Sequence, residues 1–200
     1  SMRQSVKPVS RWKLSSPIGL AIMCFAMSGC QRQLMPTPDL YAYAHDDAFD
    51  RVPADYQNNQ VDVLYVTDRS PIGESKNGPT YGYGRSHSLA FGSCVVEIGR
   101  DLSWDDLVRN SQSTKRDRSL NLAIKQVRES ARFPTVPYPI ADAGPPPIDD
   151  PATLSLHDQT EAALHHDLAT RLARSERKEV YLYVHGFANT FEDAMFTSAE

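Results

Sequence analysis

Apolar residues in the middle of the chain fall into two runs that have the character of strands. The segment 61–67 is rich in β-branched and aromatic residues in partial alternation, and turn-forming residues follow it at 68–71. A second strand is predicted over Leu89–Ile98. Residues 72–88 lie between the two runs and contain four glycines, so we expect most of this stretch to be an extended loop.

The next part of the chain mixes helical and strand patterns. Ser103 has a hydroxyl three residues before the acidic Asp106, which is the spacing of a capping box and predicts the start of a short helix. Alternating apolar residues over 120–124 favour a third strand, although Val127 breaks the period and leaves a helix open. Residues 133–151 contain seven of the 14 prolines and predict a stiff surface loop.

The last third of the chain predicts a helix, a buried strand and the start of another helix. Leucines at 156, 164, 168 and 172 place an apolar stripe on a helix over residues 155–175. The run Val180–Val184 consists of strand formers only, which fits a strand buried on both faces, as in a parallel sheet. Asn189 or Thr190 can cap the helix that follows. The helix over 155–175 would then be the crossover of a βαβ-type arrangement.

The first 29 residues have the composition of an export signal. Residues 1–16 contain four basic side chains and no acidic one, and an almost wholly apolar stretch follows over 17–29. As a helix this stretch would rise only about 20 Å, whereas a spanning helix must cross a hydrocarbon core of roughly 30 Å. We therefore predict that residues 1–29 are a signal peptide and not a transmembrane anchor.

The end of this segment resembles the lipobox of bacterial lipoproteins. Small residues, Ser28 and Gly29, precede Cys30, as in that family, whose cysteine is acylated and becomes the mature N-terminus. Met27 departs from the leucine-like residue that the family usually has there. The resemblance implies lipid attachment at Cys30 and anchoring in a cell-envelope membrane after export. The alternative is a plain secretory signal with an incidental cysteine.

Residues 30–60 are polar and mixed, with three prolines, and are predicted to be a tether to a folded domain over 61–200. Without the first 29 residues the chain has 17 basic and 25 acidic side chains, a net charge of −8, which argues against nucleic acid as a partner. Once Cys24 leaves with the signal and Cys30 is acylated, Cys94 is the remaining cysteine. It cannot form an internal disulfide, and its apolar neighbours predict a buried core residue.

The loop after the run Val180–Val184 is the best candidate for chemistry. It combines Gly186 with a predicted helix N-terminus, so its backbone N–H groups can point at a developing negative charge, as in an oxyanion hole. His165 and His166 are adjacent and project about 100° apart on a helix, which excludes a facing pair of metal ligands. The sequence has no phosphate-binding loop or dinucleotide fingerprint, so we predict neither a metal nor a cofactor.

Three separated motifs carry a family resemblance. The longest is Tyr-Val-His-Gly-Phe-Ala-Asn-Thr-Phe-Glu-Asp-Ala over residues 183–194. The others are Thr67-Asp68-Arg69 after the first strand, and Tyr83-Gly84 with Phe91-Gly92-Ser93-Cys94 around the second. These motifs resemble the patterns of a bacterial group of alpha/beta hydrolases of unknown function, within the esterase/lipase superfamily. The likeness extends from about Val61 to Glu200 and leaves out residues 101–155.

The resemblance implies an α/β fold, the N-terminal part of an α/β-hydrolase three-layer sandwich with a mostly parallel sheet and helices on both faces. His185, Gly186 and Phe187 would form the oxyanion loop, in which the N–H of Phe187 is a donor and His185 is structural. The nucleophile would be a serine in a G-x-S-x-G elbow, acting on an ester or similar small acyl substrate.

No G-x-S-x-G motif occurs in the sequence, so we expect no catalytic residue among these 200. We interpret the chain as an incomplete N-terminal fragment that is inactive alone and whose full-length form is a lipid-anchored serine hydrolase. The alternative is a non-catalytic cell-envelope lipoprotein that uses the same fold as a binding or structural module, because a fold does not determine a function.

Overall fold

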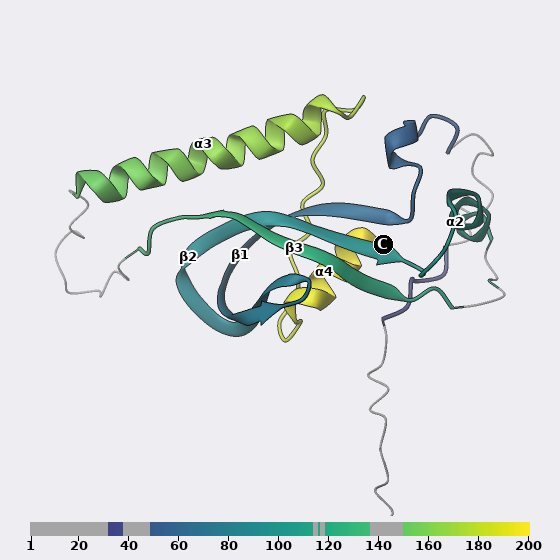
Figure 1. Cartoon of the computed structure of the whole chain (residues 1–200), viewed down its shortest axis with the longest axis horizontal. Coiled ribbons are helices and arrows are strands. Elements are labelled where there is room, and N and C mark those ends of the chain that lie inside the picture. Colours follow the sequence, from purple (N-terminus) through teal and green to yellow (C-terminus); the bar gives the residue numbers. More distant parts are fainter. Residues whose placement is uncertain (1–31, 38–48, 114–115, 117–118, 137–149) are drawn as a thin grey trace, which may run out of the picture.

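The computed structural model of the chain describes residues 32–37, 49–113, 116, 119–136 and 150–200 (Figure 1). The predicted signal peptide, the predicted lipid site at Cys30, most of the predicted tether and residues 137–149 of the proline-rich loop lie outside the described residues. Within the part of the chain that is described, no helix combines the length and the apolar character needed to cross a membrane.

Three antiparallel strands form the centre of the fold, in the order β1-β2-β3. The strands are β1 (Gln60–Ser75), β2 (Gly78–Ile98) and β3 (Leu122–Arg132). The strands predicted over 61–67 and 89–98 are confirmed, and the choice left open at 120–124 is resolved as a strand. The extended loop predicted over 72–88 is wrong, because these residues continue β1 and β2 and leave only a two-residue turn between them.

The distal half of the β1–β2 hairpin curves back onto β3, and a glycine at its tip permits the close approach. Pairing shifts register at three points over residues 67–73, and such irregularities bend a strand pair. At the tip, the N–H of Val127 donates to the carbonyl of Asn77 (2.6 Å), and the Asn77 amide donates to the carbonyl of Ile124 (2.8 Å). At Gly78, where φ is +114°, a Cβ would lie 2.0 Å from the Val127 carbonyl oxygen. Only glycine permits this approach.

Helical segments surround the sheet. They are η1 (Ala54–Tyr56), α2 (Trp104–Ser111), α3 (Pro151–Ala173) and α4 (Phe191–Ala199). The predicted capping box of α2 is confirmed: Ser103 Oγ accepts the N–H of Asp106 at 3.1 Å. The predicted helix over 155–175 is also confirmed, although α3 begins four residues earlier because Asp150 caps it and proline occupies its first position.

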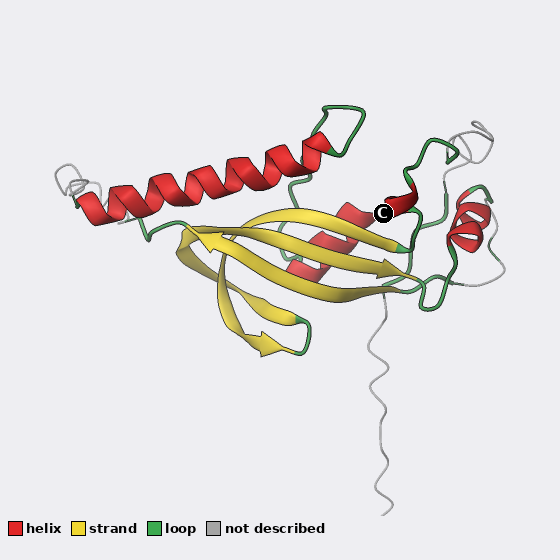
Figure 2. Ribbon diagram, turned by 45° about the horizontal axis from the view of Figure 1, so that its top comes forward, coloured by secondary structure: helices red, strands yellow, loops and turns green. Residues whose placement is uncertain are grey.

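The helices α3 and α4 lie on opposite sides of the sheet (Figure 2). The face toward α4 is apolar, and it forms one buried cluster with Phe191, Ala194 and Met195 of that helix. The sheet contributes Tyr65, Tyr81, Cys94, Val96, Ile98, Leu122 and Val127 to this cluster. Cys94 is fully buried, as predicted, and burial raises the pKa of its thiol to about 12.

Polar contacts join α3 to the other face of the sheet. Arg171 forms an ion pair with Asp62 at 3.0 Å, and the hydroxyl of Ser130 donates to Asp167 at 3.0 Å. The leucine stripe that predicted this helix is only partly buried, and Leu156 is 48% exposed. The sheet face beneath α3 therefore offers the helix few apolar neighbours.

The strand predicted over Val180–Val184 is wrong for this structure. The run lies in the connection between α3 and α4, outside the sheet, and the side chains of Tyr181 and Leu182 are each 86% exposed. Strand propensity alone cannot form a strand, because a ladder also needs a neighbouring strand in register. All described strands are antiparallel, so they do not confirm the predicted parallel sheet or three-layer sandwich.

Candidate functional site

The predicted oxyanion loop, His185 to Phe187, is part of the segment 185–190, which leads into the capped N-terminus of α4. Thr190 Oγ1 accepts the N–H of Asp193 at 3.0 Å, and the Asp193 carboxylate accepts the N–H of Thr190 at 3.0 Å. The hydrogen bonds that the carboxylate accepts from the N–H and the hydroxyl of Thr190 lower the pKa of Asp193, because they favour its ionised form. Of the two caps that the sequence allowed, Thr190 is the one used. A carboxylate in the first turn also suits the positive end of the helix dipole.

Two phenylalanines four residues apart near this loop differ sharply in burial. Phe191 is 3% exposed, and its ring lies 5.0 Å from that of Tyr65 and 4.8 Å from that of Tyr81, measured between centroids. Phe187, at the tip of the loop, is fully exposed. The packing of Phe191 fixes where α4 begins on the sheet, and it therefore fixes the C-terminal end of the loop.

A buried hydrogen-bond network supports the Phe191 site from the sheet. The hydroxyls of Tyr65 and Tyr81 lie 2.9 Å apart, and that of Tyr81 donates to Glu129 at 2.6 Å. Two Arg132 nitrogens donate to the same carboxylate at 2.7 and 2.9 Å. Burial raises the pKa of Tyr65 to about 12 and raises that of Tyr81 as well. Burial would also raise the pKa of Glu129, but the hydrogen bonds from Arg132 and Tyr81 outweigh it and lower that pKa.

Sequence analysis missed this network, because its members come from three strands. Tyr81 and Glu129 are 48 residues apart, and no spacing along the chain indicates that they form a hydrogen bond.

Arg69 connects the predicted loop to β1. Its guanidinium is buried, with the whole residue 5% exposed, and it donates to the carbonyl of Asn189 at 2.6 Å and to that of Gly82 at 2.9 Å. It also lies 5.5 Å from the centroid of the Tyr83 ring. Three motif segments that are distant in the sequence, which contain Arg69, Tyr83 and Asn189, therefore meet at one place.

Several backbone N–H groups of the loop have no acceptor among the residues that the structure describes. No described residue accepts a hydrogen bond from the N–H of Gly186, Phe187 or Ala188. His185 Nδ1 lies 2.9 Å from the carbonyl of Gly186, so its ring stays within the loop. A Cβ built at Gly186 would meet nothing within 4 Å among the described atoms, so the space above this glycine is open.

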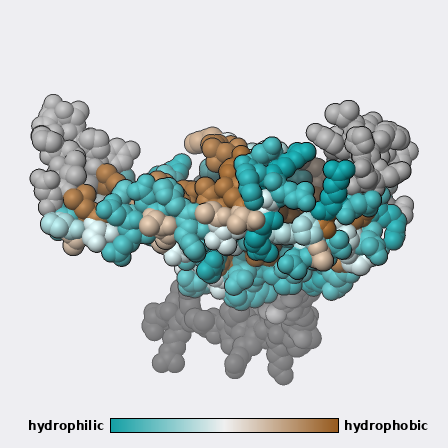
Figure 3. Space-filling model, turned by 90° about the horizontal axis from the view of Figure 1, so that it is seen from above, coloured by the Kyte–Doolittle hydropathy of each residue, from teal (hydrophilic) through white to brown (hydrophobic). Residues whose placement is uncertain are grey.

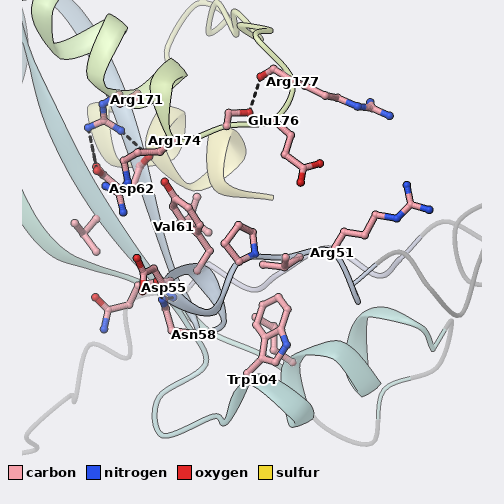
Figure 4. Close-up of a pocket in the computed structure, with 17 residues that line it drawn as sticks. Arg51, Asp55, Asn58, Val61, Asp62, Trp104, Arg171, Arg174, Glu176 and Arg177 are labelled. Atoms are coloured by element: carbon pink, nitrogen blue, oxygen red, sulfur yellow. Dashed lines mark hydrogen bonds and ion pairs between the residues drawn. The ribbon is translucent and has the colours of Figure 1, made fainter.

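The predicted site does not coincide with a groove found elsewhere in the described part of the structure. The groove has a volume of about 1230 Å³ and lies between the C-terminal end of α3, the start of β1 and α2 (Figure 4). Arg171 there pairs with Asp62, and the guanidinium of Arg174 lies 4.9 Å from the Tyr56 ring centroid. None of His185, Gly186 and Phe187 lines it. We place the candidate chemistry in the loop, because the sequence motifs meet there and none of the predicted site residues lies in the groove.

Within the described residues, His157, Asp158 and Glu161 form the set of possible metal ligands whose atoms all lie within 4.8 Å of one another. All three side chains are exposed on one stretch of α3. His165 and His166 are not part of it. Such exposed acidic groups are common on helices, so we assign no metal to them, and the absence of a metal or cofactor stays a prediction.

The model of a family described as "alpha/beta hydrolase of unknown function (DUF900)" matches residues 160–200. The resemblance predicted from the sequence is confirmed over this segment, which runs from the middle of α3 to the end of α4 and includes the whole loop. Comparisons with curated proteins and with solved structures gave no match.

Proposed function

We propose that residues 185–190 form the oxyanion loop of a serine hydrolase that acts on an ester or a similar acyl substrate. The observation that carries the proposal is the set of N–H groups at Gly186, Phe187 and Ala188, which precede a capped helix and have no acceptor among the described residues. Unpaired donors at a helix N-terminus suit a negative charge. The family match over 160–200 supports a hydrolase fold around them.

In this mechanism the loop stabilises the tetrahedral intermediate of acyl transfer. As a serine oxygen bonds to the acyl carbon, the carbonyl oxygen gains negative charge and accepts a hydrogen bond from the N–H of Phe187. The open space above Gly186 gives that oxygen room to approach. Loss of one such donor typically lowers kcat by about 100- to 1000-fold. The serine, its acid and its histidine would come from outside these 200 residues, in that order along the chain.

The proposal also concerns the run Val180–Val184 and the sheet to which it would belong. In the complete gene product, the run Val180–Val184 would be a strand of a parallel sheet within a three-layer sandwich. Five consecutive strand formers support this, because leaving them exposed keeps a large apolar area in water. Hydrophobic side chains among hydrophilic ones are visible at the surface in Figure 3. Pairing with further strands would bury both faces of the run.

The first experiment is to read the coding frame beyond Glu200 for a G-x-S-x-G motif, followed by an acidic residue and a histidine. If they occur in that order, the complete gene product should react covalently with a fluorophosphonate, and its Ser→Ala variant should not. A stop codon directly after Glu200, or an elbow without serine, would contradict the proposal and favour the non-catalytic lipoprotein. Residues 31–200 alone should show no ester turnover, and measurable turnover would contradict this assignment of the nucleophile.

We also propose that the protein is exported and held in the cell envelope by acyl chains on Cys30. Labelled palmitate should be incorporated into the wild-type protein and not into the Cys30→Ala variant. Cys24→Ala is the matched control, because Cys24 lies in the predicted signal and should not affect labelling. Equal labelling of the Cys30→Ala variant would refute the lipid site.

A further inference from the structure

We propose that Arg69 is a positioning residue that holds the loop 185–190 in place from the central sheet. The effect of Arg69 on catalysis rests on the proposed function. Its role in holding the loop does not depend on that function. Arg69 lies on β1, which is far from the loop in the sequence. Its contact with Asn189 joins residues that are 120 positions apart. It is the direct hydrogen-bond connection between the sheet and the backbone of the loop among the described residues.

The contact uses the particular shape of an arginine side chain. One guanidinium nitrogen donates to the carbonyl of Gly82 on β2, and another donates to the carbonyl of Asn189 at 2.6 Å. The planar guanidinium group presents several donors in fixed directions, whereas a lysine ammonium is a compact group on a flexible stem. Arg69 can therefore fix the loop relative to β2 as well as β1.

The charge of Arg69 is directed toward the loop. Among the described residues no carboxylate forms an ion pair with it, and its contacts are the two carbonyl oxygens and the Tyr83 ring face. A buried charge is costly unless such groups stabilise it. A neutral amide could have connected the strands at lower cost. The cation lies against a residue only two positions from the proposed donor Phe187, so it also favours negative charge at this end of the loop.

The backbone next to this contact has a conformation that needs support. Ala188 has φ of +65°, in the left-handed region, which is unfavourable for an L-residue with a Cβ. Strained residues persist where their surroundings hold them. The carbonyl that Arg69 binds belongs to the next residue, Asn189, and the cap Thr190 follows it. Arg69 therefore holds the peptide between the strained turn and the start of α4.

The first arm of the test uses the chain itself and measures backbone dynamics by NMR. In Arg69→Met, we expect the order parameters of residues 186–189 to fall from rigid values to below about 0.6. Arg69→Lys should give an intermediate loss, because it keeps the charge but not the fixed donor geometry. Arg85→Met is the matched control, because Arg85 pairs with residue 69 across the hairpin and its own side chain is exposed. Unchanged NMR signals of Phe191 would show that α4 remains packed. If Arg69→Met does not fold, the order parameters are compared between the wild type and Arg69→Lys.

The second arm uses the complete gene product once serine reactivity is found. Arg69→Met should lower kcat by about 100-fold with little change in KM, as expected when reacting groups are displaced by about 1 Å. Added guanidinium ion should restore part of the activity. Order parameters in the loop that equal those of the wild type would overturn the inference, whatever the activity. A mobile loop in a protein without a reactive serine would instead refute the proposed function and leave the positioning role intact.

Discussion

Replacing Phe191 with alanine tests whether α4 owes its position to one aromatic side chain. Phe191 is 3% exposed and packs edge-on against Tyr65, with centroids 5.0 Å apart, and at a tilt against Tyr81. The substitution would leave a cavity between the two tyrosines that their hydrogen-bonded hydroxyls prevent from closing. Both the transfer of the ring to water and the cavity therefore destabilise the variant.

The expected loss of unfolding free energy is about 4 kcal/mol, the middle of the range of about 3–5 kcal/mol that Phe→Ala costs in a core. With a urea m-value of about 2 kcal/mol/M, the midpoint of unfolding falls by about 2 M. The measurement is equilibrium unfolding in urea, followed by circular dichroism and by tyrosine fluorescence. Phe191→Leu, which keeps much of the volume, should cost less than about 1.5 kcal/mol.

Phe187 provides the matched control, because it is the same residue type four positions earlier and is fully exposed. Phe187→Ala should change the unfolding free energy by no more than about 0.5 kcal/mol. A loss below about 1 kcal/mol in Phe191→Ala, or equal losses in the two variants, would refute the reasoning, because α4 would then not be part of the cooperative core.

Three further predictions concern the groups around the site. Asp193 has a lowered pKa in the folded chain, so its contribution to stability is present above the unfolded pKa of about 3.9 and is lost as the pH falls through the folded value. Asp193→Asn should remove that part of the acid dependence of the urea midpoint, and an unchanged acid profile would count against the capping box. Thr190→Ala should lower the unfolding free energy by about 1 kcal/mol at neutral pH. Tyr81→Phe leaves Glu129 and Tyr65 short of a partner and should cost about 1–3 kcal/mol, whereas Tyr83→Phe, at an exposed ring, should be near neutral in the same urea titration. In residues 31–200 the thiol of Cys94, with its pKa raised to about 12 by burial, should react with Ellman's reagent only after denaturation; fast reaction in the native chain would show that the core opens readily.

The sequence by itself determined the features that depend on near neighbours along the chain. Alternation located the strands at 61–67 and 89–98, and cap spacing located the start of α2 and the start of α4 within one residue. The His-Gly-aromatic pattern was enough to identify the hydrolase-like segment that the family match covers. These signals are local because helix caps and side-chain periodicity involve residues that are only a few positions apart.

Tertiary structure decided the rest. Residues 72–88 have the composition of a loop, yet they continue a hairpin whose tip packs against β3. There the N–H of Val127 donates to the carbonyl of Asn77, and Gly78 leaves room for the close approach. The run Val180–Val184 has the composition of a strand, yet it stays outside the sheet because no described strand lies beside it to complete a ladder. The contact between Arg69 and Asn189 and the network around Glu129 join distant segments. Strand curvature, strand pairing and long-range contacts depend on which surfaces meet when the chain folds. The local spacing of residues along the sequence does not specify which surfaces these are.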